Sequence, residues 1–480
     1  MKPKNRDGHV AKSDREQPAT FEPLTNGLPA PPAGFDPAEV VERLRIWSLT
    51  GRDRYYQMPE VPECVPKDAT EGMPSGHVNS WSESDLKREL RIDGVSSRPI
   101  EGKMASQMDL VLSHIQRERY VDYAGPMSGK PVSVYTDSQG RRLLVDSSYR
   151  LIQPCPGDWS MLRGILERML PGPRQTLILY AWLKVGIEAL RAGEARPGHG
   201  LILVGPSNCG KSLIQEHVLT ALLGGRAADP TRYLTGDTSF NSELCGAEHL
   251  AIQELTSAHD HKSRARFAEG LKQLLVTESH PLNAKYCNTI TVYPWWRVSL
   301  SINDSVDRLR ALPPLSSDFG DKVILLLCES HPMPMPSSSP KERRAFREAL
   351  TAELPAFVDF LLSWEIPEEI RQTKHAARFG HDNFHHPELS TTLFEMEPQM
   401  VLLQILDNSP DLYDNGVWGW GKQEALHKEL CDGPHGVQAA KLFSYTNACG
   451  QLLAKLRERF PERIRKDHRR NENVWQISVR

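Results

Sequence analysis

The stretch that decides the fold is Leu201-Ile202-Leu203-Val204-Gly205-Pro206-Ser207-Asn208-Cys209-Gly210-Lys211-Ser212. An apolar strand pattern runs into the spacing G-x-x-x-x-G-K-S, and a helical pattern continues as far as Leu223. The two glycines allow a tight turn whose N–H groups point inward, and the start of a helix adds its positive dipole end to the same place. The sequence therefore predicts a phosphate-binding loop in which Lys211 reaches the β- and γ-phosphates of a nucleotide and Ser212 ligates Mg²⁺.

The composition bounds the class of protein. The chain has 480 residues, of which 39% are hydrophobic and 25% charged, which is typical of a globular protein with about three domains. No apolar run is long enough for a membrane span and Met1 to Asp14 is polar, so we expect a cytoplasmic protein with no membrane contact. The cysteines form no C-x-x-C pair, which argues against a zinc site or a disulfide framework. Because the net charge is −3, contact with nucleic acid requires local basic surfaces.

The order of patterns along the chain predicts an α/β protein of several segments. We expect a disordered tail over 1–36, a small α/β domain over 37–172, a nucleotide domain over 173–330, a Pro/Ser hinge with a helical segment over 331–395, and a C-terminal module over 396–480. In the nucleotide domain, apolar runs alternate with helical patterns, as in a doubly wound parallel sheet. These runs are Leu201–Val204, His249–Ile252, Arg297–Ile302 and Lys322–Leu327.

Other elements are predicted outside that sheet. Capping residues and apolar spacing indicate helices, and a turn between two apolar runs indicates a β-hairpin. The expected helices are Ser82–Leu90, Ser106–Ile115, Trp159–Leu170, Gln175–Ala192, Lys341–Leu350 and Pro355–Trp364, and the hairpin joins Pro131–Tyr135 to Arg142–Val145.

Polar residues follow two of the predicted strands. Gln253 and Glu254 stand at the end of one strand, where an acidic pair would bind Mg²⁺ through water and activate the attacking water. Glu254 is the candidate base, but Gln253 is neutral, so either Ser212 and the phosphates hold the metal or hydrolysis is slow. Asn303 ends the next strand, where its amide can orient the water beside the γ-phosphate.

The C-terminal module has the element order of a winged helix. Helical patterns are followed by two strand patterns joined by a charged turn, and basic residues outnumber acidic ones between Gln451 and Arg480. Such an excess can follow a phosphate backbone, although a solvated helix face with a charged turn is the alternative. The candidate DNA contacts are Arg465, Lys466, Arg469 and Arg470, and the elements are Gln399–Leu406, Gln423–Leu430, Asn447–Phe460, Arg463–Lys466 and Val474–Val479.

A phosphate loop, an acidic strand end, the pair Lys285-Tyr286 between two strands and a strand ending in Asn303 occur in this order within one domain. This order resembles the superfamily 3 helicases, which have an AAA+-like P-loop ATPase core, and most of all their primase-associated branch from phages, DNA viruses and mobile elements. The resemblance implies that Lys211 and Ser212 bind ATP·Mg, that Glu254 is catalytic and that Asn303 senses the γ-phosphate.

The same resemblance implies that Lys285, with Tyr286, lies on a DNA-tracking hairpin in the central channel of a ring, although a lysine on a polar loop is often plain surface. It also implies an arginine finger from the neighbouring subunit, downstream of the sensor. A lysine, Lys322, stands in that stretch, and because its point charge cannot bind phosphate bidentately as arginine does, Arg308 or Arg310 remain alternatives.

Taken together, these residues predict an ATP-dependent DNA helicase that replicates a phage or mobile element. We expect a homo-hexamer that uses ATP and Mg²⁺, acts on single-stranded and duplex DNA, and works with a separate primase or primase-polymerase. No D-x-D pair accompanies Asp109 or Asp122, so we expect no DNA synthesis by this chain. The alternative, which Gln253 motivates, is an ATP-binding replication initiator or assembly factor with weak hydrolysis.

Overall fold

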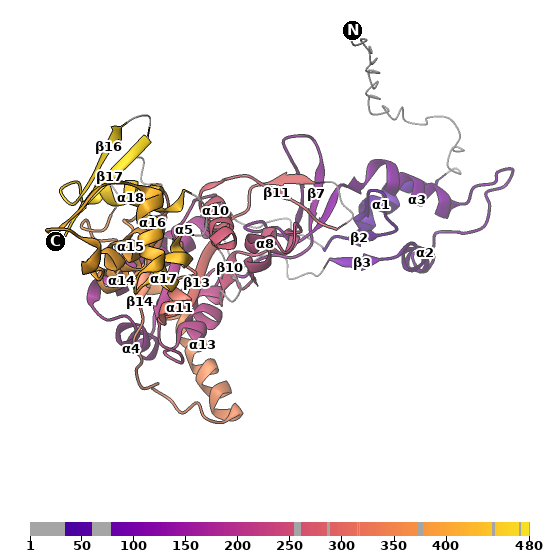
Figure 1. Ribbon diagram of the computed structural model, residues 1–480. Helices are drawn as coiled ribbons and strands as arrows, with labels where there is room; N and C mark the ends of the chain where they lie inside the picture. The colour runs from indigo at the N-terminus through magenta and orange to yellow at the C-terminus, as the bar shows by residue number, and fades with distance from the viewer. Residues whose placement is uncertain are drawn as a thin grey trace, which may run out of the picture. The chain divides into compact units, whose positions relative to one another are not determined.

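The computed structural model describes residues 34–59, 78–253, 261–285, 289–313, 315, 317–371, 378–443, 447–469 and 472–479. The described residues up to Val121 form one compact unit, and those from Asp122 onward form another (Figure 1). Within them, no helix combines the length and apolarity that a bilayer crossing requires. The predicted tail over 1–36 lies almost wholly outside the described residues.

The first unit packs helices against a four-stranded sheet of order β3-β2-β1-β4. Its two longer helices begin where the sequence predicts: the Ser82 hydroxyl accepts from the N–H of Asp85, and Ser106 and Asp109 form a capping box. The elements are α1 (Pro37–Leu44), β1 (Ile46–Leu49), β2 (Tyr55–Gln57), β3 (Asn79–Trp81), α2 (Glu83–Ile92), α3 (Gln107–Glu118) and β4 (Tyr120–Val121).

The second unit begins with a small three-stranded sheet. β5 (Tyr123–Gly125) pairs in parallel with β7 (Arg142–Val145), which pairs antiparallel with β6 (Ser133–Thr136). The β6–β7 pair is the predicted hairpin, which is confirmed. Two helices then lead to the main sheet, α4 (Ser160–Met169) and α5 (Pro173–Ala192).

The centre of the second unit is a five-stranded sheet of order β14-β8-β13-β10-β9, parallel throughout. The predicted α/β architecture with a parallel sheet is therefore confirmed, with one short strand, β9, that the sequence did not indicate. The strands are β8 (Gly200–Gly205), β9 (Ala227–Ala228), β10 (His249–Ile252), β13 (Arg297–Asn303) and β14 (Val323–Leu327).

Alternate residues of β8 face two different hydrophobic cores, because successive side chains of a strand point to opposite faces. Leu201 and Leu203 join the core formed with α4, α5 and α13 (Pro340–Ser363). Ile202 and Val204 join the core that includes Phe267 and α10 (His261–Val276). Both faces of the sheet are thus covered, as expected for a parallel sheet.

The helix that follows the loop is continuous but not uniform. It comprises α6 (Lys211–Leu213), a segment η2 (Ile214–Leu219) with wider π-type turns, and α7 (Thr220–Leu222). Thr220, the residue that directly follows the wider stretch, donates from its hydroxyl to the carbonyl of Gln215 at 3.0 Å. Turns of this type are frequent at functional sites.

Shorter elements connect the strands of the main sheet. They are α8 (Thr231–Thr235), α9 (Ser242–Cys245), β11 (His280–Leu282), β12 (Ile290–Val292), α11 (Val306–Leu309) and α12 (Ser317–Gly320). β11 and β12 pair antiparallel, so they form a hairpin.

One helix prediction is wrong. We expected two helices over Lys341–Leu350 and Pro355–Trp364, but a single helix, α13, contains Pro355 in its interior. An interior proline costs about 3 kcal/mol because it removes one hydrogen bond and clashes with the preceding turn. The residues on both sides of Pro355 are buried, among them Leu354 and Phe357, and their packing against α4 and α5 outweighs that cost.

The C-terminal module has its own hydrophobic core, with Leu402, Leu453 and Trp475 at its centre. Figure 1 shows the strands β16 and β17, drawn in yellow, beside the helices of the module. The predicted helices and strands are present, and α17 and β15 are additional. Before the module, α14 (Pro387–Glu395) packs Leu389 and Leu393 into the core on one face of the main sheet. The elements of the module are α15 (Pro398–Asp407), η4 (Pro410–Leu412), β15 (Val417–Lys422), α16 (Gln423–Asp432), α17 (Gly436–Leu442), α18 (Ala448–Arg459), β16 (Ile464–Arg469) and β17 (Glu472–Ser478), with sheet order β15-β17-β16.

Candidate functional site

The loop Gly205–Ser212 lies at the carboxyl edge of the main sheet, between β8 and α6. Its tight course depends on left-handed backbone angles, with φ of 65° at Asn208 and 105° at Gly210. Gly205 has no room for a side chain, because a Cβ there would overlap the carbonyl oxygen of Cys328, the residue that directly follows the neighbouring strand β14. The local sequence therefore forms a turn that a bulkier residue at Gly205 would not permit.

Lys211 is held in the loop by several hydrogen bonds of its ammonium group. Its Nζ donates to the carbonyl oxygens of Gly205 and Pro206, both at 2.7 Å, and to Oδ1 of Asn303 at 3.3 Å. The side chain is only 7% exposed. An ammonium has three donors, and all three find acceptors at this site.

Asn303 reaches Lys211 because of strand register. β13 pairs directly with β8, and Asn303 lies opposite Gly205, the first residue of the loop. The carboxyl ends of adjacent parallel strands meet at one edge, which is where open α/β sheets bind ligands. The structure thus brings together two of the residues that the sequence predicted at the γ-phosphate.

A cavity of about 610 Å³ opens at this edge. Its volume lies within the range of about 300–1,000 Å³ typical of small-molecule sites. Its walls come from the loop, from the ends of β10 and β13, from α11, and from α13 with the segment before it. The lining residues are Ser207, Asn208, Gly210, Lys211, Ser212, Leu213, Gln253, Ser301, Ile302, Asn303, Arg308, Met333, Ser337, Arg343, Phe346 and Arg347.

Gln253 also lines the cavity, but Glu254, the predicted base, lies outside the described residues. The Gln253 amide donates to Oε1 of Glu216 at 2.7 Å. Sequence reasoning did not single out Glu216, although it follows Ser212 by one helical turn and so shares its helix face. A carboxylate therefore stands beside the neutral Gln253.

Cys209 lies in the loop beside Lys211 and is fully buried. A hydrogen bond with Cys328, and then the positive charge of Lys211, lower the pKa of the Cys209 thiol to about 6. Lys211 Nζ is 3.5 Å from Cys209 Sγ. The buried ammonium of Lys211 is therefore a positive charge in the loop that favours an anionic ligand.

The three candidates for the finger occupy different places. Arg308, in the short helix α11 after β13, lines the cavity of its own chain. Arg310 does not line it and pairs with Asp307 at 3.5 Å on the surface. Lys322 pairs with Asp321 at 2.7 Å and lies at the opposite, amino edge of the sheet, where its carbonyl accepts from the N–H of Gly200.

Helix α13 adds residues that sequence reasoning missed. Arg343, Phe346 and Arg347 line the cavity from its first turns. The spacing of the two arginines, four residues apart on a helix, was the available signal, because such residues share one face. Nothing in the sequence indicated that this face meets the phosphate loop.

One of the two predicted DNA-tracking residues, Lys285, lies on the β11–β12 hairpin. Lys285 is in the connection between the two strands, with Nζ 5.7 Å from the centre of the Phe240 ring. Tyr286 falls outside the described residues. Lys285 itself is exposed, and it belongs to a different element from the phosphate loop.

The basic residues of the C-terminal module divide between two faces of β16. Lys466 shares the face of the buried Ile464, and its Nζ lies 5.3 Å from the ring of Trp475. Arg465 points to the opposite, exposed face. Arg469 contacts the ring of Trp420 at 4.6 Å, and Arg470 lies outside the described residues.

Comparisons with known proteins bear mainly on the fold. A family of unknown function (DUF5906) matches residues 203–312, a range that includes Lys211 and Asn303. No curated protein sequence matches the chain. An apo structure of the NrS-1 C-terminal region is 12% identical with a TM-score of 0.51, over 92% of this chain and 98% of that chain. The A-form apo structure of the same region is 12% identical with a TM-score of 0.50, over 92% and 99%.

These two structures show a shared fold over most of the chain. The active helicase Cch of SCCmec type IV is 12% identical with a TM-score of 0.26, over 81% of this chain and 70% of that chain, which is too low to indicate a common fold.

Proposed function

We propose that this chain is an ATP-dependent DNA helicase that replicates a phage or mobile element, and that it works as a ring, a homo-hexamer, with ATP between adjacent subunits. The observation that carries the proposal is the cavity at the carboxyl edge of the main sheet, where Lys211, Ser212 and Asn303 line one wall. Phosphate loop, metal ligand and γ-phosphate sensor are the parts that an ATP-driven motor needs in one place.

Nucleotide binding follows from the donors around the loop. The backbone N–H groups of Gly205–Ser212 and the start of α6 attract phosphate oxygens. Lys211 exchanges its contacts with the Gly205 and Pro206 carbonyls for contacts with the β- and γ-phosphates. The exposed Ser212 hydroxyl would hold Mg²⁺, whose charge offsets that of the phosphate oxygens.

Hydrolysis requires a base, a sensor and an external cation. Glu254 takes the proton of the attacking water, and Asn303 orients that water beside the γ-phosphate. The next subunit supplies the cation, for which Arg308, Arg310 and Lys322 are the candidates. Because Lys322 lies at the sheet edge opposite its own loop, only a neighbouring subunit's site is open to it.

The DNA contacts divide between two parts of the chain. Lys285 and Tyr286 on the hairpin follow the phosphates of one strand, while the C-terminal module, a winged helix in our assignment, holds or loads DNA. Contacts of this kind are sensitive to salt and largely indifferent to sequence. A separate primase would supply the primers.

The test compares the intact chain with Glu254→Gln. We expect DNA-stimulated ATP turnover and displacement of an annealed strand by the intact chain, and loss of both in the variant. Arg88→Lys, which keeps the surface charge beside Asp85 on α2 and touches no residue of the proposed site, is the matched control for handling and assembly. Particles imaged with ATP and single-stranded DNA should be rings. A chain that stays monomeric under every ligand condition and displaces no strand would refute the proposal.

A second candidate function is an ATP-binding replication initiator with weak hydrolysis. The observation that favours it is Gln253, a neutral residue at the cavity, which bonds to Glu216 and presents no acid of its own. In that case ATP binds, but turnover is near zero and Glu254→Gln does not change it.

A further inference from the structure

A second cavity, of about 240 Å³, lies between the β5–β7–β6 sheet and the hairpin strand β12. Its walls are mostly apolar, with Met127, Leu143 and Val292 among them. Two tyrosines also line it: Tyr135, on β6, and Tyr293, which directly follows β12 and is 57% exposed. The cavity is smaller than the roughly 300 Å³ at the low end of ordinary ligand sites, so it suits one flat ring better than a whole nucleoside triphosphate.

One polar group in this cavity lacks a partner. Ser128 lines the cavity and is only 2% exposed, and its Oγ has no hydrogen-bond partner in the described part of the chain. A buried hydroxyl without a hydrogen-bond partner is unfavourable for stability, so its presence calls for an explanation. A ligand with a hydrogen-bonding edge supplies one.

The aromatic and basic groups around the cavity suit a nucleic acid. The Tyr135 hydroxyl already donates to the carbonyl of Pro131 at 3.0 Å, so that ring is fixed. Lys130 Nζ stands 5.6 Å from the centre of the same ring and carries a positive charge to the rim. Aromatic rings beside a cation are the combination on which bases of single strands stack.

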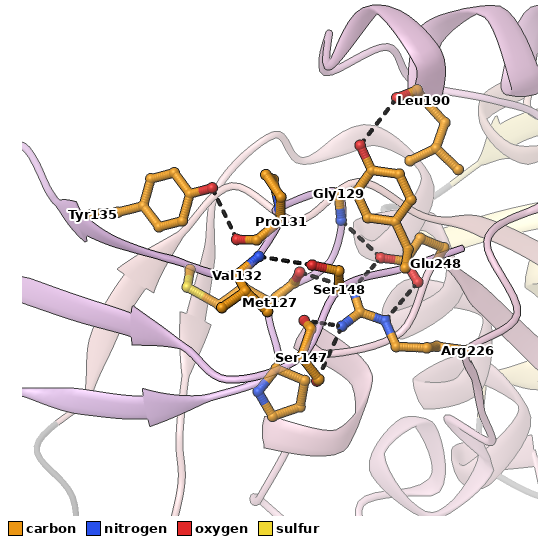
Figure 2. A network of polar contacts seen from close by, with 12 residues as sticks. Met127, Gly129, Pro131, Val132, Tyr135, Ser147, Ser148, Leu190, Arg226 and Glu248 are labelled. Atoms are coloured by element: carbon orange, nitrogen blue, oxygen red, sulfur yellow. Dashed lines mark hydrogen bonds and ion pairs between the residues drawn. The ribbon is translucent and has the colours of Figure 1, made fainter. Parts of the chain in front are cut away.

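The residues on both sides of Ser128, Met127 and Gly129, are hydrogen-bonded to Arg226 and Glu248, as Figure 2 shows. Arg226 donates to the carbonyl of Met127 at 3.0 Å and is paired with Glu248, which accepts from the N–H of Gly129 at 2.9 Å. Burial raises the pKa of Glu248, and the hydrogen bond and charge of Arg226 oppose that shift. A wall fixed in this way loses little entropy when a ligand binds.

The cavity is also connected to the hairpin that carries Lys285. Arg141, from the turn between β6 and β7, donates to the carbonyl of Thr289 at 3.2 Å, directly before β12. Val292 and Tyr293, at the other end of β12, line the cavity itself. A strand that follows Lys285 can therefore reach this cavity along the same hairpin.

We infer that this cavity receives one base of single-stranded DNA, stacked against Tyr293 and hydrogen-bonded to the Ser128 hydroxyl, with Lys130 near its phosphate. The inference rests on the proposed function, since it assumes that a DNA strand follows the hairpin. It adds a base-stacking contact to the phosphate contacts proposed for Lys285.

The test measures the affinity of the full chain for a single-stranded oligodeoxythymidine and for an abasic strand of equal length. The wild type should prefer the strand that carries bases. Because base–aromatic stacking is worth about 1–3 kcal/mol for each base, Tyr293→Ala should weaken oligodeoxythymidine binding by roughly tenfold or more and leave abasic binding unchanged. Tyr293→Phe, which keeps the ring, is the matched control and should bind as the wild type does.

Ser128→Ala is the second variant, and it separates binding from folding. Because it removes a hydroxyl that no protein group bonds, the melting temperature should not fall. Affinity for oligodeoxythymidine should still drop several-fold. A preference for bases over abasic sites that neither variant alters would overturn the inference.

ATP turnover and strand displacement, measured on the same wild-type preparation, keep the two proposals apart. If the wild type hydrolyses ATP and displaces strands but its base preference survives both substitutions, only the cavity assignment fails. If the wild type shows neither activity yet both substitutions remove its base preference, the helicase proposal fails and the cavity assignment stands.

Discussion

The two edges of the five-stranded sheet both carry polar and charged residues, yet they differ in access. At the carboxyl edge, Lys211 and Asn303 border a cavity of about 610 Å³. At the amino edge, His199 precedes β8 and Arg297 begins β13, and both are enclosed together with His381. A polar residue at a sheet edge therefore indicates a site only where the edge is open to a ligand.

The chemistry of the amino edge follows from that enclosure. Burial lowers the pKa of His199 to about 2, that of His381 to about 4 and that of Arg297 to about 9. Arg297 bonds to the carbonyls of Arg196 at 2.7 Å and Trp296 at 3.1 Å, and no acidic side chain pairs with it within the described residues. These groups hold strand ends together, whereas the carboxyl edge is arranged for an incoming anion.

The largest effect is expected from removing the ammonium at the open edge. Lys211→Ala should lower ATP turnover by about 10²–10³, the loss typical when one group that stabilises transition-state charge is removed. Phosphate release under saturating ATP is the measurement, with Arg88→Ala, an exposed residue of α2 that does not line the cavity, as the control. Turnover that survives Lys211→Ala would mean that the cavity is not where ATP is split.

Substitutions at the enclosed amino edge of the sheet should lower the free energy of unfolding and leave ATP turnover unchanged. Arg297→Ala removes the donor to one buried and one half-buried carbonyl and opens a cavity, so we expect a loss of about 3 kcal/mol in the free energy of unfolding. Denaturant titration gives that number. ATP turnover per folded molecule should equal that of the wild type. If Arg297→Ala lowered turnover as much as Lys211→Ala does, the amino edge would contribute to catalysis as the carboxyl edge does.

The buried histidines give the closed edge a dependence on pH. The pKa of His199 is about 2 in the folded chain against about 6.5 unfolded, so the unfolded chain binds the extra proton and stability falls as pH decreases below about 6.5. His199→Asn should reduce the slope of unfolding free energy against pH by up to about 1.4 kcal/mol per pH unit between pH 6 and 4. An unchanged slope would show that His199 titrates normally.

The open edge was largely predictable from sequence, and the closed edge was not. Gly205–Ser212 and the apolar runs of β8 and β13 are local patterns, and parallel pairing then places Asn303 beside the loop. The contribution of α13 to the cavity depends on how distant segments pack, as does its continuity through Pro355. The sequence gives no reason to treat Arg297 as more than an ordinary charged residue at the start of a strand. Its burial without an acidic partner depends on tertiary packing and could not be predicted.

A similar contrast, between an exposed and a packed cationic side chain, occurs on β16. The substitutions there are expected to have the smallest effects. Arg465 is exposed, whereas Lys466 lies against the ring of Trp475, so only Arg465 is free to follow a DNA phosphate. Arg465→Ala should lower the slope of log affinity for DNA against log salt by about one.

Lys466→Ala is the matched comparison, since it removes an equal charge from the other face of the same strand. It should leave the salt slope unchanged and cost about 0.5–1 kcal/mol of stability through the lost contact with Trp475. The measurements are DNA affinity over a series of salt concentrations and a denaturant titration of each variant. Equal changes in slope for both substitutions would show that strand face does not decide which cation meets DNA, and no change in either would return the module to a structural role.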